Sequence, residues 1–197
     1  MRRIAVIVAL VTAGSAAAQT GQTDALGGTL RAVVQMDAQL YVRDSVLDPA
    51  GDYYPDERAL GQGWALFTYE RGNLRMGMRY ENYQNAILGF PTGYRGEGIT
   101  YRYAQWQQGK FDITVGNFFE QFGQGLVFRA YEERGLGLDN AMDGSRIIAR
   151  LPKGLTLKGV IGRQRVYFAK SDGILRGTDA EWALREAVPA LDKMGLG

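Results

Sequence analysis

Hydrophobic and polar residues alternate with a period of two along much of the chain. The clearest run covers residues 29–43, where every even position from Leu30 to Val42 is apolar and most odd positions are polar. A period of two places the two sets on opposite faces of a β-strand, whereas an α-helix would scatter both sets around its surface. This run therefore predicts a strand with one apolar and one polar face.

The same alternation recurs, with less contrast, in six further segments. They are residues 64–71, 73–83, 99–107, 110–119, 142–151 and 155–168. Their lengths match a strand that crosses a membrane, which needs about 9 to 11 residues, better than a strand of an ordinary globular protein, which has about 5 or 6. The sequence therefore predicts an all-β fold with membrane-crossing strands.

Short and long connections alternate between these segments. Tight turns are predicted at residues 71–73, 108–109 and 152–154, where glycine supplies the positive φ that such hairpins need. Long connections are expected at residues 45–63, 84–98 and 120–140. Outer-membrane barrels have this asymmetry, with short turns on the periplasmic side and long loops outside. The pattern predicts an antiparallel transmembrane β-barrel.

A further short strand at residues 125–131 would invert this alternation of turns and loops. We therefore assign these residues to the long connection, which we expect to fold back into the barrel lumen as loops do in porins.

The first 18 residues have the composition of a signal peptide. Arg2 and Arg3 precede an apolar stretch at residues 4–13, and small residues at positions 16–18 suit a signal peptidase. The apolar stretch is shorter than the roughly 20 residues of a spanning helix, which argues against a membrane anchor. We expect cleavage after Ala18, a polar leader at residues 19–27, and barrel strands and loops at residues 28–176.

The end of the chain, residues 177–197, does not continue the alternation. Thr178 as N-cap and Glu181 three residues later form a capping box, which predicts a short C-terminal helix at residues 178–191. Seven long strands are fewer than the eight or more of a bacterial single-chain barrel. We therefore expect a truncated chain that forms a partial, open barrel. The alternative is a complete small protein with a periplasmic tail.

The composition excludes several classes of function. The chain has no His and no Cys, which removes Ser-His-Asp hydrolysis, thiol nucleophiles and typical zinc sites. Without Arg2 and Arg3 the basic residues only balance the 21 acidic ones, so no basic patch indicates a nucleic-acid partner. The glycine-rich stretches at residues 93–98 and 135–137 are not followed by a predicted helix and do not form a phosphate loop. We expect no enzymatic activity, no cofactor and no metal.

Charged and polar residues gather in the third long connection and just after it. They are Glu120, Arg129, Glu132, Glu133, Arg134, Asp139, Asn140, Asp143 and Arg146. Two of these carboxylates could in principle serve glycoside hydrolysis, but the spacing specifies no such pair, and the nearby arginines favour ionised, paired carboxylates. A salt-bridged loop that holds its own shape is the plain interpretation. The functional interpretation is that these residues form a constriction in the barrel lumen, which selects solutes by size and charge.

The stretch from residue 116 to residue 144 is distinctive. It reads Gly-Asn-Phe-Phe-Glu-Gln-Phe-Gly-Gln-Gly-Leu at 116–126 and Arg-Ala-Tyr-Glu-Glu-Arg-Gly-Leu-Gly at 129–137, followed by Asp-Asn-Ala at 139–141 and Asp-Gly at 143–144. With the flanking Arg-Tyr-Glu at 79–81, Leu-Gly-Phe at 88–90, Lys-Gly at 158–159 and Gly-Arg-Gln at 162–164, the chain resembles an uncharacterised family of exported Bacteroidota proteins. That family has no known function and is presumed to form outer-membrane β-barrels.

The resemblance implies a location and a fold but no mechanism. Members of that family are longer than this chain, which implies that the chain is an N-terminal portion.

We therefore expect an outer-membrane β-barrel that passes small solutes or serves as an envelope scaffold, with residues 120–143 as its constriction. The expected partners are the lipid bilayer, small solutes and other envelope proteins. One alternative is a secreted β-sandwich that binds glycans; it predicts a mature protein that stays in solution without detergent. Another is a non-pore component of an envelope assembly, which predicts co-purification with a second envelope protein.

Overall fold

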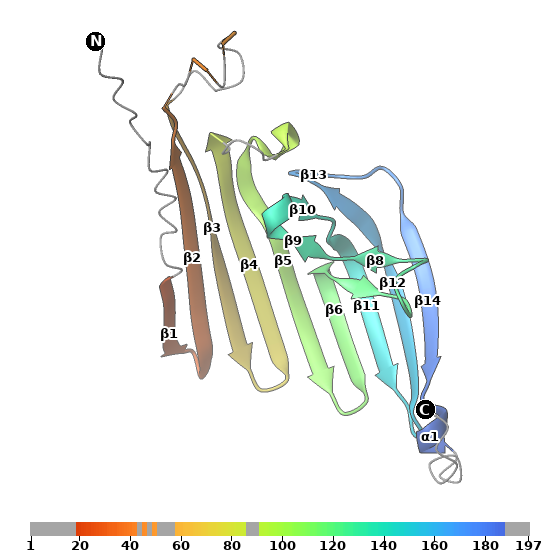
Figure 1. The fold of residues 1–197 in the computed structure, drawn as a ribbon. Coiled ribbons are helices and arrows are strands. Elements are labelled where there is room, and N and C mark those ends of the chain that lie inside the picture. Colours follow the sequence, from red (N-terminus) through yellow and green to blue (C-terminus); the bar gives the residue numbers. More distant parts are fainter. Residues whose placement is uncertain (1–18, 43–44, 47–48, 51–57, 86–90, 188–197) are drawn as a thin grey trace, which may run out of the picture.

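The computed structural model describes residues 19–42, 45–46, 49–50, 58–85 and 91–187. Its main feature is one large antiparallel sheet in which most neighbouring strands also follow one another along the chain (Figure 1). The strands are β1 (Gln19–Ala25), β2 (Gly28–Leu40), β3 (Ala59–Arg71), β4 (Leu74–Asn85), β5 (Glu97–Gln108), β6 (Phe111–Phe118), β11 (Met142–Arg150), β12 (Leu155–Val166) and β14 (Leu175–Trp182), with the short β13 (Ala169–Lys170) beside the end of β12. The predicted all-β, antiparallel fold is confirmed.

All seven predicted strands are present, and most of their bounds differ from the prediction by one to three residues. The largest difference is in β3, which begins at Ala59 and not at position 64. Leu60 and Gln62 are buried in this additional part of the strand. They pair with Gln39 and Asp37 of β2, so backbone pairing with the neighbour extends the strand beyond its visible alternation.

The predicted tight turns also form, and each contains residues with positive φ. Gly72 has a φ of +54° and Gly109 a φ of +55°, while Lys153 and Gly154 have values of +61° and +72°. All the short turns join the strands at one end of the sheet, and the longer connections begin at the opposite end, where β2, β4, β6 and β12 end (Figure 1). The predicted difference between the two ends of the sheet, short turns at one and longer connections at the other, is therefore present.

The two faces of the sheet have opposite character, because side chains alternate between them. The outer face is apolar and exposed. Its exposed side chains include Val34, Met36, Leu40, Phe67, Met76, Met78, Ile99, Trp106, Phe111, Val115, Ile147, Leu157 and Ile161. The inner face carries the polar and charged positions. In the described part of the chain no second sheet covers the outer face, so the two stacked layers of a β-sandwich are not seen.

The sheet does not close into a ring within the described residues. β1 and β14 lie at its two edges, and they do not pair with each other. The structure therefore shows an antiparallel sheet and no closed barrel among the described residues. None of the helices in the described ranges is long and apolar enough to cross a membrane.

The predicted C-terminal helix is wrong over residues 178–182. These residues extend β14, and only a single turn of helix, α1 (Leu184–Ala187), follows. Asp179 pairs with Lys158 in the ladder with β12. The Glu181 side chain accepts a hydrogen bond from Lys158 Nζ at 2.8 Å and is not the carboxylate of a capping box. Pairing with a strand distant in sequence overrides the local helix signal.

The leader predicted at residues 19–27 contains a strand. β1 forms a hairpin with β2, with Asp24 opposite Thr29. Its residues are polar on both faces, so the sequence shows no alternation, but the free backbone groups of β2 provide a partner for it. The predicted signal peptide, residues 1–18, lies outside the described residues.

Candidate functional site

The chain between β6 and β11 forms an inserted segment, residues 119–141, that lies over the inner face of the sheet (Figure 1). It consists of β7 (Glu120–Gln121), β8 (Arg129–Ala130), β9 (Glu132–Glu133), the 3₁₀ turn η2 (Arg134–Leu136) and β10 (Leu138–Asp139). β7 pairs with β8, and β9 pairs with β10. The turn η2 ends at Gly137, whose φ of +61° suits glycine. The connection therefore packs on the polar face of the sheet.

An apolar cluster anchors one half of the inserted segment. It comprises Phe118, Phe128, Ala130, Met142 and Val160, with Phe122 and Leu175 packed against it. A Cβ atom at Gly177 of β14 would lie 2.7 Å from the ring of Phe122. Glycine at that position lets the ring pack on the sheet.

A cluster of charged side chains holds the other half, and we call it the upper cluster. It consists of Arg79 and Glu81 of β4, Glu132 of β9, Asp139 of β10 and Arg165 of β12. Arg79 forms ion pairs with Glu81 through Nε at 2.6 Å and with Glu132 through Nη1 at 2.9 Å, and its Nη2 donates to Asp139. Arg165 donates to Glu81 through Nη2 at 2.6 Å and to Asp139 through Nη1.

Four of these five side chains are almost completely removed from solvent. No more than 4% of the side chain of Arg79, Glu81, Asp139 or Arg165 is exposed. Burying a charge is costly unless it is paired, and breaking one buried pair typically costs about 3–5 kcal/mol. The four ion pairs among them therefore fix β10 firmly against the sheet.

The upper cluster also shows that the inner face is concave. Glu81 and Arg165 lie on β4 and β12, which are separated in the sheet by β5, β6 and β11. In a flat sheet these four steps would span about 19 Å, more than the two side chains can bridge. Their contact at 2.6 Å therefore requires a strongly curved sheet.

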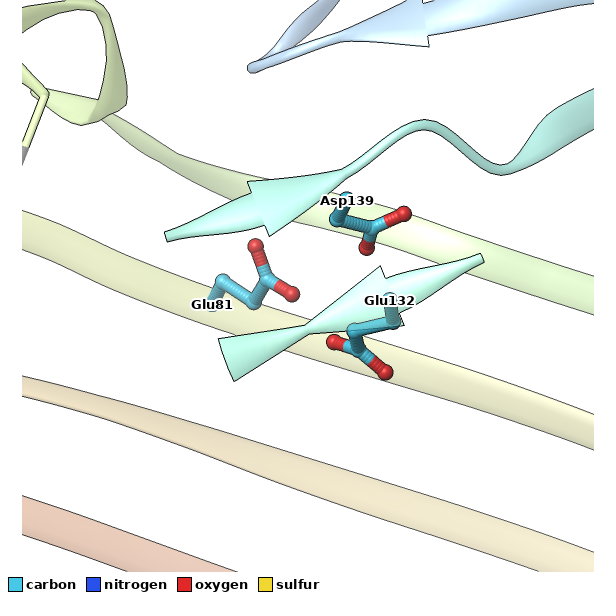
Figure 2. Close-up of side chains that lie close together, drawn as sticks. All are labelled: Glu81, Glu132 and Asp139. Atoms are coloured by element: carbon cyan, nitrogen blue, oxygen red, sulfur yellow. The ribbon is translucent and has the colours of Figure 1, made fainter. Parts of the chain in front are cut away.

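Three carboxylates of the upper cluster converge in a way that resembles a cation site. Figure 2 shows Glu81, Glu132 and Asp139 facing one another, and one oxygen atom of each lies within 4.8 Å of the others. The guanidinium of Arg79, however, contacts all three carboxylates. The positive charge at this point is supplied by arginine, so the carboxylates are not an open set of metal ligands.

A second group of charges, the lower cluster, holds the start of the inserted segment. Arg146 of β11 donates to Asp112 Oδ1 at 3.2 Å, to Thr114 Oγ1 at 3.1 Å and to Glu120 Oε2 at 3.3 Å. Lys158 of β12 lies 3.4 Å from Glu120 Oε1. Glu120 thus bridges β7 to two strands of the sheet.

Between the two clusters lies a cavity of about 380 Å³. Its walls include Arg79, Tyr101, Tyr103, Glu132, Arg134 and Arg146. Glu132 joins the cavity to the upper cluster, because it accepts from Arg79 and also lies 3.0 Å from Arg134 Nη2. The guanidinium of Arg134 stacks on the ring of Trp64 at 4.0 Å. The cavity therefore combines aromatic walls with fixed charges of both signs.

Aromatic side chains pack together over the concave face, at the end of the sheet where the longer connections begin. Tyr94 of the turn η1 (Thr92–Tyr94) lies 5.4 Å from Tyr83 and 4.9 Å from Tyr167, measured between ring centroids. Phe168 lies 6.3 Å from Tyr83. Burial raises the pKa of Tyr94 to about 12, so its phenol stays neutral at ordinary pH. These four residues form a cap beside the upper cluster.

The structure brings together five of the nine residues that the sequence singled out. Glu132, Arg134 and Asp139 belong to the upper cluster or touch it, and Glu120 and Arg146 belong to the lower cluster.

The other four predicted residues lie elsewhere. Asn140 braces the inserted segment, because its Oδ1 accepts from the Tyr131 amide at 2.6 Å. Arg129 stacks on the ring of Tyr131 at 4.2 Å, and Glu133 is exposed. Asp143 alternates onto the outer face, where it pairs with Arg102 at 3.5 Å and lies apart from the two clusters.

Sequence reasoning missed Arg79, Glu81 and Arg165, although they form the centre of the upper cluster. They come from β4 and β12, which are distant from the inserted segment along the chain. The available signal was modest. Arg79 and Glu81 occupy the polar positions of a predicted strand, but nothing local shows which partners lie opposite them.

Comparison with curated proteins and with solved structures found no significant match. The model of one protein family matches residues 1–196, which is almost the whole chain. Its description is that of a family of unknown function, which agrees with the resemblance to an uncharacterised family. The chain belongs to this family of unknown function, DUF6029.

Proposed function

We propose that the chain forms wall strands of an outer-membrane β-barrel in which the inserted segment narrows a polar interior and lets small solutes pass. One observation carries the proposal. The sheet has a continuous, exposed apolar outer face, while its concave inner face is polar and holds an inserted segment tied down by buried ion pairs.

The outer face supports a membrane location. Met36 is 65% exposed and Leu40 is 73% exposed, and similar side chains continue across the sheet to Ile161 at 45%. In water, an apolar patch larger than a few hundred Å² is unusual on a monomeric protein. Contact with lipid chains would remove the free-energy cost of exposing this apolar surface to water. The long strands have 8 to 13 residues, close to the length that a membrane-crossing strand needs.

A membrane location places a requirement on the two edges of the sheet. Backbone N–H and C=O groups have no water to bind within a bilayer, so every strand there needs a partner on both sides. The proposal therefore requires that β1 and β14 be paired in the membrane, with further strands or with each other. The total number of strands then sets the width of the interior.

The inserted segment supports a constriction inside that interior. It is held at three places, by the apolar cluster, the upper cluster and the lower cluster. The cavity beneath it presents arginines and a carboxylate at fixed positions. Rings of fixed charge at a narrow point select solutes by size and charge. A scaffold without a pore would need the same ion pairs but no passage beside them.

Conductance across a planar bilayer tests the proposal. The full chain should insert and open channels, and Arg134→Gln should shift the permeability ratio towards cations, because Arg134 lines the cavity. Arg71→Gln, at the turn between β3 and β4, is the matched control and should leave the ratio unchanged. A folded, membrane-inserted protein that opens no channels would contradict solute passage and leave the scaffold role. A processed protein that stays in the aqueous fraction would contradict the membrane location itself.

A further inference from the structure

The outer face carries a groove among its apolar side chains. A cavity of about 530 Å³ opens on this face over β6, β11, β12 and β14. Ile113, Ile147 and Ile161 line it. Gly159 stands between Ile147 and Thr178 in the sheet, and because it has no side chain it leaves the floor of the groove open.

A patch of cationic side chains lies at the end of this groove that faces the long connections. It comprises Arg102, Arg163, Lys170 and Arg176, and we call it the basic patch. Arg176 itself lines the groove. It pairs with Ile161 in the ladder between β12 and β14, and Arg163 lies opposite Asp143 of the outer face in the ladder between β11 and β12. The groove thus continues directly into the patch.

The basic patch keeps a net positive charge. Its central carboxylate is Asp143, which faces Arg163 in the ladder between β11 and β12 and contacts both Arg102, at 3.5 Å, and Lys170. Asp172 follows in the link before β14. Four cations near two carboxylates favour an anionic group at this point of the outer face.

We propose that the groove and the basic patch together bind one lipid with a phosphorylated glycolipid headgroup, of the lipid A type. An acyl chain lies in the groove, and a headgroup phosphate is held by Arg163 and Arg176. Arginine suits this role because its planar fork matches two phosphate oxygens.

This inference rests on the proposed membrane location. In outer-membrane barrels the long loops face outward, so the patch is at the level of the outer leaflet, which is where a phosphorylated glycolipid is found. The charge of the patch selects this occupant over a neutral lipid.

Titration of the detergent-solubilised full chain with bisphosphorylated lipid A, followed by native mass spectrometry, tests the inference. The wild type should retain one lipid. The double variant Arg163→Gln/Arg176→Gln should bind roughly thirtyfold more weakly, since each basic residue near an anionic lipid contributes about a fivefold effect. Gly159→Val, which fills the groove, should also weaken binding. Arg150→Gln, at the opposite end of β11, is the matched control and should bind like the wild type.

Two further lipids test whether the site recognises the phosphates and the glycolipid headgroup. Dephosphorylated lipid A and phosphatidylglycerol should both bind more weakly than bisphosphorylated lipid A. Equal binding of the dephosphorylated lipid, equal binding of phosphatidylglycerol, or unchanged binding by the double variant would each overturn the inference. All these measurements use protein that has been extracted from the membrane with detergent. A negative result therefore argues against the lipid site and not against the membrane location.

Discussion

Arg79 links the sheet to the inserted segment through one guanidinium group. It contacts Glu81 on its own strand and Glu132 and Asp139 on two strands of the segment. Asp139 is shared with Arg165, so two arginines and three carboxylates form one connected group. Such a group stabilises only when every member keeps a partner, because an unpaired buried charge is costly.

Asp139→Asn tests this connectivity. The substitution keeps the shape of the side chain but removes the charge that Arg79 and Arg165 share. We expect the free energy of unfolding, measured in urea with the refolded protein, to fall by about 3–5 kcal/mol. Glu70→Gln is the control, because Glu70 pairs with the exposed Arg31 and Arg75 and should cost no more than about 1 kcal/mol. Equal losses in the two variants would refute a special role for the upper cluster.

Arg79→Ala tests whether arginine takes the place of a cation. Removing the guanidinium leaves three carboxylates with oxygen atoms within 4.8 Å of one another, with Arg165 still the partner of Glu81 and Asp139. Oxygen ligands of this kind suit Ca²⁺. We expect the variant to be destabilised and to recover part of its thermal midpoint when Ca²⁺ is added. The wild type should not respond to Ca²⁺. If Ca²⁺ raises the thermal midpoint of the variant and of the wild type equally, the ion does not bind at these carboxylates.

At the scale of the element, the inserted segment is a unit tied to the sheet by identifiable contacts. Glu120 is its first attachment, because it pairs with Arg146 and Lys158. The amide of Phe122, which donates to the carbonyl of Phe128 at 3.0 Å, reports on the adjoining hairpin. Opening of this hairpin should therefore depend on Glu120 more than on exposed residues of the same segment.

Hydrogen exchange of Glu120→Gln measures that dependence. We expect the Phe122 amide to exchange faster in the variant, while the amides of β2 and β3 keep their protection, because only the hairpin loses an attachment. Glu133→Gln alters an exposed residue of the same segment and should leave exchange unchanged. Unchanged exchange at Phe122 in the Glu120 variant would mean that the apolar cluster alone holds the hairpin.

The elements differ in how far the sequence predicts them. The strand at residues 29–43 was predictable because its two faces differ in polarity from one end to the other. β1 was not, because it is polar on both faces, and the second half of β14 was mistaken for a helix because a capping box is a purely local signal. Both strands exist because a neighbouring strand offers free backbone groups, and a single sequence does not show this.

The same limit applied to the charged residues. Their concentration at residues 120–146 indicated a salt-bridged segment, and the structure places ion pairs there. The sequence did not show that Arg165 of β12 reaches Glu81 of β4, because that contact depends on the curvature of the whole sheet. Alternation along β11 turns Asp143 to the outer face, which the register of that strand shows and its place in the charged stretch does not.

At the scale of the whole molecule, the proposed membrane location rests on the contrast between the two faces of one curved sheet. The inner face is polar, concave and partly filled by the inserted segment. The outer face is apolar and ends in a basic patch at the edge of the long connections. If the outer face contacts lipid and the inner face contacts water, the inserted segment lies in the polar interior, and the groove and basic patch lie against the lipid.

Nitroxide scanning of β2 in lipid vesicles tests this contrast most directly. The chain contains no cysteine, so each of positions 33–40 can be replaced singly and labelled. We expect labels at Val34, Met36, Ala38 and Leu40 to be most accessible to oxygen dissolved in the bilayer. Labels at the intervening positions should be most accessible to a water-soluble nickel complex. Equal accessibility of both sets to the nickel complex would contradict the account.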